Sequence, residues 1–489
     1  MSESQPAPSG RSLYFGGNWH HPASGRYVPT FNPGLGEAIT DVAQSDSADV
    51  DAAVRAAHAA FRVWRDVAPL ERARLLKEVG TVVRAHAREL AELDAANCGN
   101  PVREMLGDAT VAAAQLDFFA GLVTEMKGDT IPMGPDALNL TVRQPLGVVA
   151  RILAFNHPFM FCAGKIAAPL AAGNTVIVKP PEQAPLSSLR LAELVHNILP
   201  KGVFSVLPGG RETGAALAGH PGIAKVAIIG SVGAGRAVMR AASDTIKPVL
   251  LELGGKNALI AFPDADPEQV AQAIVNGMNF TWCGQSCGST SRAFVHRNIY
   301  EDVLARLPGK ARHFVPGVPT NETTTMGALI SRTQYERVLE YISSAEKEGA
   351  RLLTGGRTPT DPALRKGFYI EPTIFVDVAP TMRIAREEIF GPVLAILPWE
   401  DEATMLSQVN RVEYGLTCSI WTSDLLKAHR TALAVEAGFV WINEVSKHFL
   451  GAPFGGWKQS GVGREECLAE LLAFTQEKNI HVSLKQESA

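Results

Sequence analysis

The chain has 489 residues, of which 46% are hydrophobic and 20% are charged, and its formal net charge is -4. This length predicts two or three domains, and this composition is typical of a soluble globular α/β protein rather than a disordered one. The charge predicts no nucleic-acid partner, and every apolar run is interrupted too early to predict a membrane partner.

The N-terminal stretch MSESQPAPSGRS has no basic segment followed by an apolar one, so we expect no signal peptide and a cytoplasmic location. The next long region, Asp51 to about Leu93, is rich in alanine. Val54, Ala57 and Trp64 recur in it at helical spacing, which predicts a helical lead-in.

From Leu146 the pattern changes to short apolar strands that alternate with helical segments. The strands are GVVARILAF, TVIVKP, FSVLPG, KVAIIG and VLLELGG. This alternation predicts a parallel, doubly wound sheet whose strands are buried on both faces. A second α/β region is expected from Asn257 to about Gly451.

Two further segments have a strand pattern but no local sheet. They are KGDTIPMGPDALNLTVRQPLG, before the first sheet, and NIHVSL, near the C-terminus. Isolated strands often pair elsewhere, so we expect a small arm that joins subunits.

Ligands of open parallel sheets bind beyond the carboxyl ends of the strands, so polar residues at these ends are candidates for a site. Lys179 ends one strand, and Glu182 follows it. Another strand runs into GSVGAG, residues 230–235, and then a helix, which is the layout of a phosphate-binding turn. Its spacing is not that of the dinucleotide fingerprint, and glycines that only permit close packing are an equal alternative.

The segment NFTWCGQSCGSTSR places Cys283 and Cys287 four residues apart. No second ligand pair lies nearby, so we predict no metal site. Packing is the ordinary role of a buried cysteine. Ser286 and Gly288 leave space beside Cys287, which favours a nucleophile there.

Three other polar residues stand at strand or turn positions. Glu252 ends an apolar strand and is either an ion-paired residue or a general base. Glu388 lies in a turn-like segment, and Asn156 follows the first strand of the sheet, where its amide could stabilise an oxyanion.

Seven segments together resemble one family, the NAD(P)-dependent aldehyde dehydrogenases: FNHPF, VKPPEQAP, GSVGAG, LELGGK, GQSC, EEIFGPV and PFGGWKQSG, in the family's order and spacing. The resemblance implies an α/β fold with three parts. These are a Rossmann-like NAD-binding domain (1–122 and 147–253), a catalytic domain (254–467), and a small β oligomerisation arm (123–146 and 468–489) of a homodimer or homotetramer.

The resemblance also assigns roles. Cys287 matches the nucleophile that forms a thiohemiacetal and then a thioester with an aldehyde. Asn156 matches the oxyanion donor, and Glu252 matches the base that activates water. Lys165 matches a proton-relay lysine. Leu468 stands where some members carry the relay carboxylate, so we expect no such relay here and exchange of the Glu252 proton through water.

The implied cofactor is NAD. The matching residues are Lys179 and Glu182 for the adenosine ribose, Gly230, Ser231 and Gly235 for the pyrophosphate, and Glu388 and Phe390 for the nicotinamide half. A carboxylate at position 182 would repel a 2′-phosphate, which predicts a preference for NAD over NADP.

The substrate tunnel implied by the resemblance contains Val111, Phe161, Gly164, Trp282, Lys447, His448 and Phe454. Trp282 replaces a frequent asparagine, and packing against the nucleophile loop is its expected role, with lining of the tunnel as the alternative. Gly164 and Gly288 remove bulk and predict room for a ring or a long chain. Thr110 and Val111 disfavour a cationic substrate, whereas Lys447 and His448 could favour an anionic tail or simply be solvated.

We therefore expect oxidation of an aldehyde, aromatic or carboxylate-bearing, to its acid. One alternative is a dehydrogenase that transfers the acyl group to coenzyme A, and the presence of Glu252 argues against it. The other alternative is an inactive binding protein of the same fold, and the joint presence of Cys287, Asn156 and Glu252 argues against that.

Overall fold

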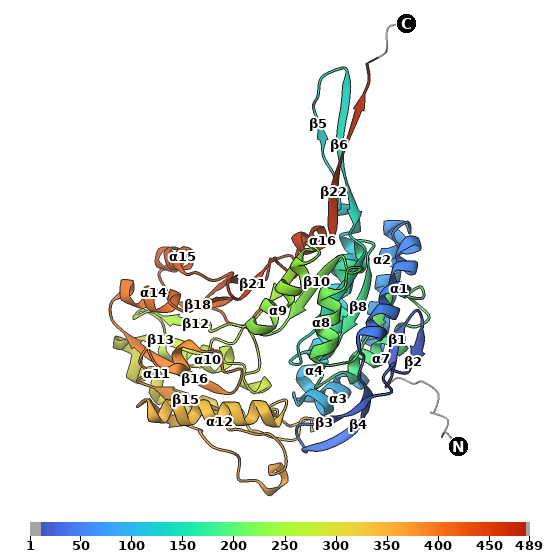
Figure 1. The fold of residues 1–489 in the computed structure, drawn as a ribbon. Coiled ribbons are helices and arrows are strands. Elements are labelled where there is room, and N and C mark those ends of the chain that lie inside the picture. Colours follow the sequence, from blue (N-terminus) through green and yellow to red (C-terminus); the bar gives the residue numbers. More distant parts are fainter. Residues whose placement is uncertain (1–10, 486–489) are drawn as a thin grey trace, which may run out of the picture.

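The computed structural model describes residues 11–485 and contains an eight-stranded sheet in the first half of the chain (Figure 1). Its strands in spatial order are β2 (Asn18–His20), β1 (Leu13–Phe15), β9 (Phe204–Val206), β8 (Thr175–Lys179), β7 (Val148–Ile152), β10 (Lys225–Ile229), β11 (Val249–Glu252) and β21 (Gly461–Val462). The five strands from β9 to β11 are mutually parallel. Among these parallel strands, β7 comes first in the chain. Strands β8 and β9 follow on one side of it, and β10 and β11 follow on the other. This order confirms the predicted Rossmann-like sheet.

Helices cover both faces of this sheet. They are α1 (Ser47–Trp64), α2 (Pro69–Ala85), α3 (Ala87–Cys98), α4 (Val102–Gly121), α5 (Pro158–Lys165), α6 (Ala167–Ala171), α7 (Leu186–Val195), α8 (Arg211–Gly219) and α9 (Val232–Ser243). Side chains of α2 and α4 to α7 pack on one face, and those of α1, α8 and α9 pack on the other. Neighbouring strand residues divide accordingly: Val149 lies in the first core, and Val148 and Ala150 lie in the second. The continuous apolar strands are therefore buried on both faces, as predicted.

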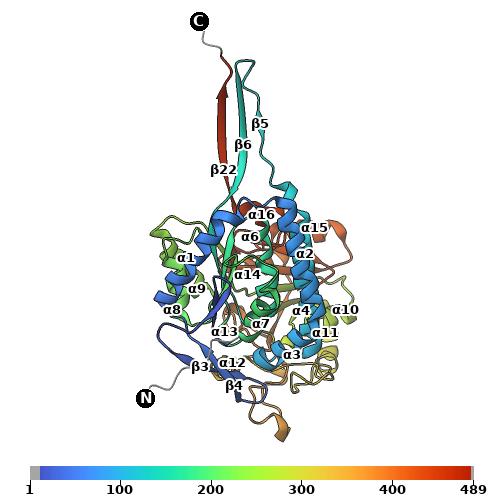
Figure 2. The same cartoon turned by 90° about the vertical axis from the view of Figure 1, so that its right-hand side faces the viewer.

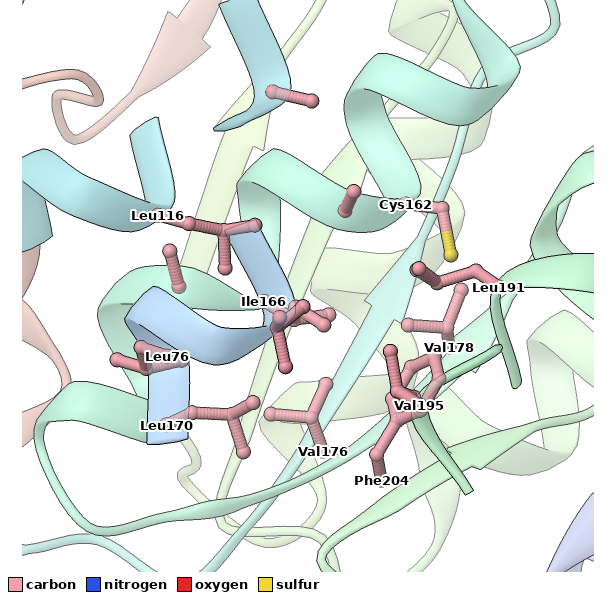
Figure 3. Close-up of a cluster of buried hydrophobic side chains, with 14 of the residues drawn as sticks. Leu76, Leu116, Cys162, Ile166, Leu170, Val176, Val178, Leu191, Val195 and Phe204 are labelled. Atoms are coloured by element: carbon pink, nitrogen blue, oxygen red, sulfur yellow. The ribbon is translucent and has the colours of Figure 1, made fainter. Parts of the chain in front are cut away.

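The first of these cores is visible in Figure 3. Val176 and Val178 of β8 and Phe204 of β9 face Leu191 and Val195 of α7. Further labelled members come from the other helices of this face: Leu76, Leu116, Cys162, Ile166 and Leu170. Cys162 behaves here as a small buried hydrophobic residue, which is the ordinary role of a free cysteine.

Local sequence explains where two of the helices begin. Asp46 caps α1 by accepting hydrogen bonds from the amides of Ala48 and Asp49, and the Asp46 amide donates to the Asp49 carboxylate. Ser231 caps α9 by accepting from the Ala234 amide. Each side chain satisfies amides that the first helical turn leaves free.

The second half of the chain forms a seven-stranded sheet. Its strands in spatial order are β14 (Arg351–Thr354), β15 (Thr373–Val376), β16 (Val393–Trp399), β13 (Arg292–His296), β12 (Ala258–Ala261), β18 (Thr417–Trp421) and β19 (Phe439–Ile442). All neighbours except β14 and β15 are parallel. Its helices are α10 (Pro267–Gly277), α11 (Arg297–Ala311), α12 (Arg332–Lys347), α13 (Arg383–Arg386), α14 (Glu402–Asn410) and α15 (Leu425–Ala434). This confirms the second α/β region.

Short elements connect these parts. They are the hairpin β3 (Tyr27–Asn32) and β4 (Glu37–Ala43), the pair β17 (Tyr414–Gly415) and β20 (Trp457–Lys458), and the 3-10 turns η1 (Val123–Glu125), η2 (Phe280–Trp282) and η3 (Pro362–Leu364). Across residues 11–485, no helix is long and apolar enough to span a membrane.

A three-stranded arm projects from the body of the molecule (Figures 1 and 2). It consists of β5 (Thr130–Ile131), β6 (Ala137–Pro145) and β22 (Thr475–Ser483), and β6 pairs with β22 along its whole length. The two strand segments that lacked a local sheet in the sequence therefore pair with each other.

The C-terminal segment returns to the first sheet before it enters the arm. Strand β21 pairs with β11. Leu471 in α16 (Leu468–Ala473) and Phe474, directly after this helix, are fully buried in the first core. The predicted limits assigned residues 461–467 to the catalytic domain and 468–474 to the arm, so this segment lies elsewhere than expected. The reason is tertiary: its pairing partner, β11, is about two hundred residues away in the chain.

Phe474 is a sensitive point of this arrangement, because its buried ring packs below two cations, Arg151 at 4.9 Å and Lys225 at 4.6 Å. We expect Phe474→Ala to destabilise the protein by about 3–5 kcal/mol, since the truncation removes apolar burial and leaves a cavity. Thermal unfolding monitored by circular dichroism measures this change. Leu468→Ala is the control variant, because Leu468 lies in the preceding helix α16 and is 38% exposed. Equal melting temperatures of the two variants would contradict the prediction.

Candidate active site

A cavity of about 820 Å³ lies beyond the carboxyl ends of the first sheet and extends to the second domain. The strand order reverses at β7, and parallel sheets form a crevice at such a point. The cavity brings together most of the predicted site residues: Asn156, Lys179, Glu182, Gly230, Ser231, Glu252, Cys287, Glu388 and Phe390.

Cys287 lies on a loop that the structure holds by its backbone. The side-chain amide of Asn257 donates to the carbonyls of Cys287, at 2.6 Å, and Ser289, at 3.0 Å. Gly284 has a φ of +66°, and a side chain there would overlap the Gly391 carbonyl, so the loop needs glycine at this position. Burial raises the pKa of the Cys287 thiol to about 12, and the charges of Glu252 and Glu388 act in the same direction.

Cys283 has a different environment. It is fully buried in the core of the second domain. This agrees with the packing role expected for it, whereas Cys287 is partly exposed and lines the cavity.

Asn156 follows β7 and lines the same cavity, and 4% of it is exposed. Its backbone carbonyl accepts a hydrogen bond of 2.7 Å from the Asn100 side chain. This contact fixes the backbone of Asn156, and its side chain makes no hydrogen bond with the described residues.

Glu252 is the last residue of β11, and only 5% of it is exposed. Its Oε1 is buried without a hydrogen-bond partner among the described residues. Burial raises the pKa of the carboxyl well above its usual range, and the negative charge of Glu465 adds to this effect. A side chain at Gly455 would lie 2.9 Å from Oε1, so glycine leaves the carboxyl its space.

We expected no relay between Lys165 and a C-terminal carboxylate, but two C-terminal carboxylates contact Lys165, so the reason for that expectation is wrong. Nζ of Lys165 lies 2.9 Å from Glu465 and 3.4 Å from Glu466. Leu468 led to the error, because the carboxylates stand two and three residues before it. Arg151 of β7 joins the same cluster, with an Nη1 atom 2.6 Å from Glu465.

The cluster continues to the surface through Glu466. Its Oε2 lies 3.2 Å from Nδ1 of His448, which is partly exposed. Burial alone would raise the pKa of Glu466, but Lys165 and His448 outweigh it and lower this pKa to about 2. The charge of Glu466 is therefore retained at neutral pH.

Lys179 and Glu182 line one end of the cavity. Nζ of Lys179 donates to the Pro180 carbonyl at 3.0 Å, and burial lowers the pKa of this amine to about 8, against the charge of Glu182. Gly230 and Ser231 line the wall at the start of α9. Gly235 does not line the cavity, since its α-carbon faces Leu253, where a side chain would lie 2.6 Å from Cδ1. Close packing therefore accounts for the glycine at position 235. The sequence had left this open as the alternative to a phosphate-binding role.

The opposite wall contains Glu388 and Phe390. The Gly255 amide donates to Glu388 at 3.0 Å, and a side chain at Gly254 would overlap the same carboxylate. Burial raises the pKa of Glu388. The Phe390 ring packs edge-on against Phe155, with centroids 5.6 Å apart.

Two lining residues of α12 were absent from the predicted set. Gln334 donates to the Phe390 carbonyl at 2.8 Å, and Arg337 donates to the Glu388 carbonyl at 2.9 Å. Their sequence signal is only that of a polar helix face, so no local pattern distinguishes them from solvated residues.

The three aromatic residues of the predicted tunnel each pack against a histidine ring. Trp282 and Phe161 both pack against the His157 ring, with centroids 4.7 Å and 5.6 Å away. Phe454 packs against His448 at 4.5 Å. Val111 lies on α4 and is 42% exposed.

The space expected beside Gly164 is filled. A side chain at this position would overlap Oε1 of Gln115, which comes from α4 and is 1% exposed. The prediction that Gly164 provides room for substrate is therefore wrong, because α4 supplies a side chain that the local sequence does not reveal. At Gly288 the expected space is present, since a side chain there would meet only Ser286, at 3.9 Å.

Lys447 and His448 each already contact a carboxylate. Nζ of Lys447 lies 2.6 Å from Glu444, and His448 is paired with Glu466. The expectation that they attract an anionic tail is not supported, because each already has a carboxylate partner.

Sequence reasoning also missed a buried ion pair beside Asn156. Nδ1 of His157 lies 2.8 Å from Oδ2 of Asp108 on α4, and each side chain is 8% exposed. The signal in the sequence was a histidine directly after the oxyanion candidate, within the FNHPF motif.

Comparison with known proteins adds the family. The aldehyde dehydrogenase family matches residues 19–480. Aldehyde dehydrogenase tropH of Talaromyces stipitatus is 51% identical, and the match covers 98% of this chain and 94% of that protein. A betaine aldehyde dehydrogenase of Sinorhizobium fredii is 40% identical over 98% of each chain.

Solved structures agree. PnpE of Pseudomonas sp. WBC-3, also solved with nicotinamide adenine dinucleotide, is 38% identical with a TM-score of 0.95, covering 98% of this chain and 99% of that chain. The indole-3-acetaldehyde dehydrogenase AldA of P. syringae, in complex with NAD+ and IAA, is 35% identical with a TM-score of 0.94 over 98% of each chain. The chain therefore belongs to the aldehyde dehydrogenase family, which confirms the resemblance carried by its seven motifs.

Proposed function

We propose that this protein oxidises an aromatic aldehyde to the carboxylic acid and reduces NAD. The observation that carries the proposal is one cavity that holds Cys287, Asn156 and Glu252 together with the candidate nucleotide-binding residues. A nucleophile, an oxyanion donor and a base in one site are the requirements of this reaction.

The cavity suits a dinucleotide. The twelve-residue helix α9 directs its N-terminus to the wall at Ser231, where backbone amides favour a pyrophosphate. Lys179 and Glu182 are available for ribose hydroxyls. Glycines keep the wall open, because side chains at Gly210 and Gly254 would contact Glu182 and Glu388.

In the proposed reaction, the Cys287 thiolate attacks the aldehyde carbon, a C–S bond forms, and the carbonyl oxygen becomes an oxyanion. The Asn156 amide and the Cys287 backbone N–H would donate hydrogen bonds to it. Bound NAD supplies the acceptor for the hydride that leaves this carbon, so the acyl group remains on Cys287 as a thioester.

Hydrolysis then needs a base. Glu252 accepts a proton from a water molecule as the water oxygen attacks the thioester carbon. The C–S bond breaks, the acid leaves, and the thiolate of Cys287 is restored. The unpartnered Oε1 of Glu252 is free to bind that water, and Lys165 with its glutamates offers a route for the proton.

An aromatic substrate is favoured over a carboxylate-bearing one. The rings of Phe161, Trp282 and Phe454 supply apolar faces on which an aromatic ring can pack. Lys447 and His448 each already contact a carboxylate of the chain, so they offer little to a second one. The relative AldA is named an indole-3-acetaldehyde dehydrogenase, and the aldehyde in that name carries an aromatic ring, which agrees with this choice.

Assembly and location complete the proposal. The arm exposes Ile131, Leu138, Ile480 and Val482, and apolar side chains on a projecting sheet favour pairing with a second copy, as a homodimer or homotetramer. We also retain a cytoplasmic location as a prediction.

A screen of aldehydes tests the reaction directly. With NAD, we expect kcat/KM to be highest for benzaldehydes and lowest for aminobutyraldehyde, with succinic semialdehyde between them. NADH absorbance and analysis of the product with and without coenzyme A provide the measurement. Cys287→Ala should abolish NADH formation and esterase activity. An acyl-coenzyme A product would favour the acylating alternative, and absence of NADH with every aldehyde would favour the inactive one.

Glu252→Gln separates the two half-reactions. We expect a burst of NADH of about one equivalent per active site and then a stall, because the thioester forms but is not hydrolysed. In the wild type, kcat should rise with pH, by up to about tenfold per pH unit, because only deprotonated Glu252 can accept a proton. Its raised pKa places this rise above that of an exposed glutamate. Rapid-mixing absorbance measures the burst, and full turnover by the variant would exclude Glu252 as the base.

Cofactor choice depends on Glu182. We expect kcat/KM for NADP to be about 100-fold lower than for NAD, because a 2′-phosphate beside this carboxylate costs several kcal/mol. Glu182→Gln removes this negative charge and should reduce the difference in kcat/KM between NAD and NADP. Equal kcat/KM values for NAD and NADP in the wild type would contradict the prediction. They would indicate that Arg211, which lines the same cavity, offsets the negative charge of Glu182.

A further inference from the structure

The buried pair of Asp108 and His157 has no role in the chemistry derived above. Nδ1 of His157 must donate to the Asp108 carboxylate, because a carboxylate only accepts. Burial by itself would lower the pKa of His157, but the charge of Asp108 and its hydrogen bond outweigh burial and raise this pKa. This raised pKa favours the imidazolium form of the ring, in which Nε2 also carries a proton.

Nε2 has no hydrogen-bond partner among residues 11–485, although the side chain is more than nine-tenths buried. Nε2 is not among the fully buried side-chain atoms that lack a partner, so it keeps some exposure and can bind a ligand or water. His157 therefore offers one unused hydrogen-bond donor.

The position of this donor relates it to the substrate. His157 directly follows Asn156, and its ring packs edge-on against Trp282 of the nucleophile loop, with an interplanar angle of 84°. Neither His157, Trp282 nor Phe161 lines the cavity that suits the dinucleotide. The aldehyde hydrogen must face the cofactor, so the remainder of the substrate extends from Cys287 away from that cavity, to the side on which these rings lie.

We propose that His157 is a specificity-determining residue that donates a hydrogen bond from Nε2 to an oxygen substituent on the ring of an aromatic aldehyde. The substrate class is then a hydroxylated benzaldehyde or a close analogue, with Trp282 and Phe161 packing on its ring. Asp108 acts through His157 as a positioning residue. This inference rests on the proposed function and adds the substituent to it.

The test compares kcat/KM for benzaldehyde with the values for 2-, 3- and 4-hydroxybenzaldehyde. The wild type should prefer at least one hydroxylated isomer by about 10- to 100-fold, the range expected for a hydrogen bond to a charged group. His157→Phe should reduce that ratio to about one, and His157→Gln, which keeps an N–H donor, should retain part of it. Asp108→Asn should lower the ratio as well, because the ring loses its charge.

A matched control is available on the surface. Nδ1 of His86 also lies 2.9 Å from a carboxylate, that of Glu89, but both of these side chains are exposed to solvent. His86→Phe should leave the substrate ratio unchanged. A loss in His157→Phe that is equal for all four aldehydes would show a structural role only and would overturn the inference.

The remaining outcomes also decide. Equal kcat/KM for benzaldehyde and all hydroxylated isomers in the wild type would overturn the inference while leaving the dehydrogenase proposal intact. Absence of NADH with every aldehyde would refute the proposed function and this inference with it. If His157→Phe does not fold, the ratios of His157→Gln and Asp108→Asn decide, because both retain a polar side chain of similar size.

Discussion

The ion pair between Arg151 and Glu465 is the interaction on which the catalytic region depends. Arg151 lies in the central strand β7 and is 1% exposed, so its charge needs a buried partner. Glu465 supplies it from the C-terminal segment and also contacts Lys165. Removing one partner of such a buried pair typically costs about 3–5 kcal/mol. This pair therefore holds the segment that carries β21 against β11, at the position where β11 ends in Glu252.

The same burial that stabilises this region sets the resting state of the chemistry. Burial favours the neutral forms of both the Cys287 thiol and the Glu252 carboxyl, and the negative charge of Glu252 disfavours the Cys287 thiolate further. Burial therefore works against a thiolate and a charged base at the same time. Preorganised donors at Asn156 become useful only when the reaction places negative charge near them.

Sequence reasoning recovered the two α/β regions, the parallel character of the first sheet, and most of the predicted residues that line the cavity, because each depends on a local signal: an apolar strand followed by a polar or glycine-rich turn. It failed where two distant segments meet. Gln115 fills the space beside Gly164, and Glu465 reaches Lys165 from three hundred residues away. Glu466 likewise reaches His448 from eighteen residues away, whereas Glu444, the partner of Lys447, is only three residues from it in the sequence.

Adjacent residues of one strand end serve the two sides of the proposed site. Asn156 lines the cavity, and His157 turns to the nucleophile loop, yet both are held from the region around the start of α4. Asn100, two residues before that helix, binds the Asn156 carbonyl, and Asp108 within it binds the His157 ring. A shift of α4 would therefore move the oxyanion donor and the proposed substrate contact together. Substitutions at Asp108 act on one of them alone, which is why that position can separate substrate choice from the chemistry.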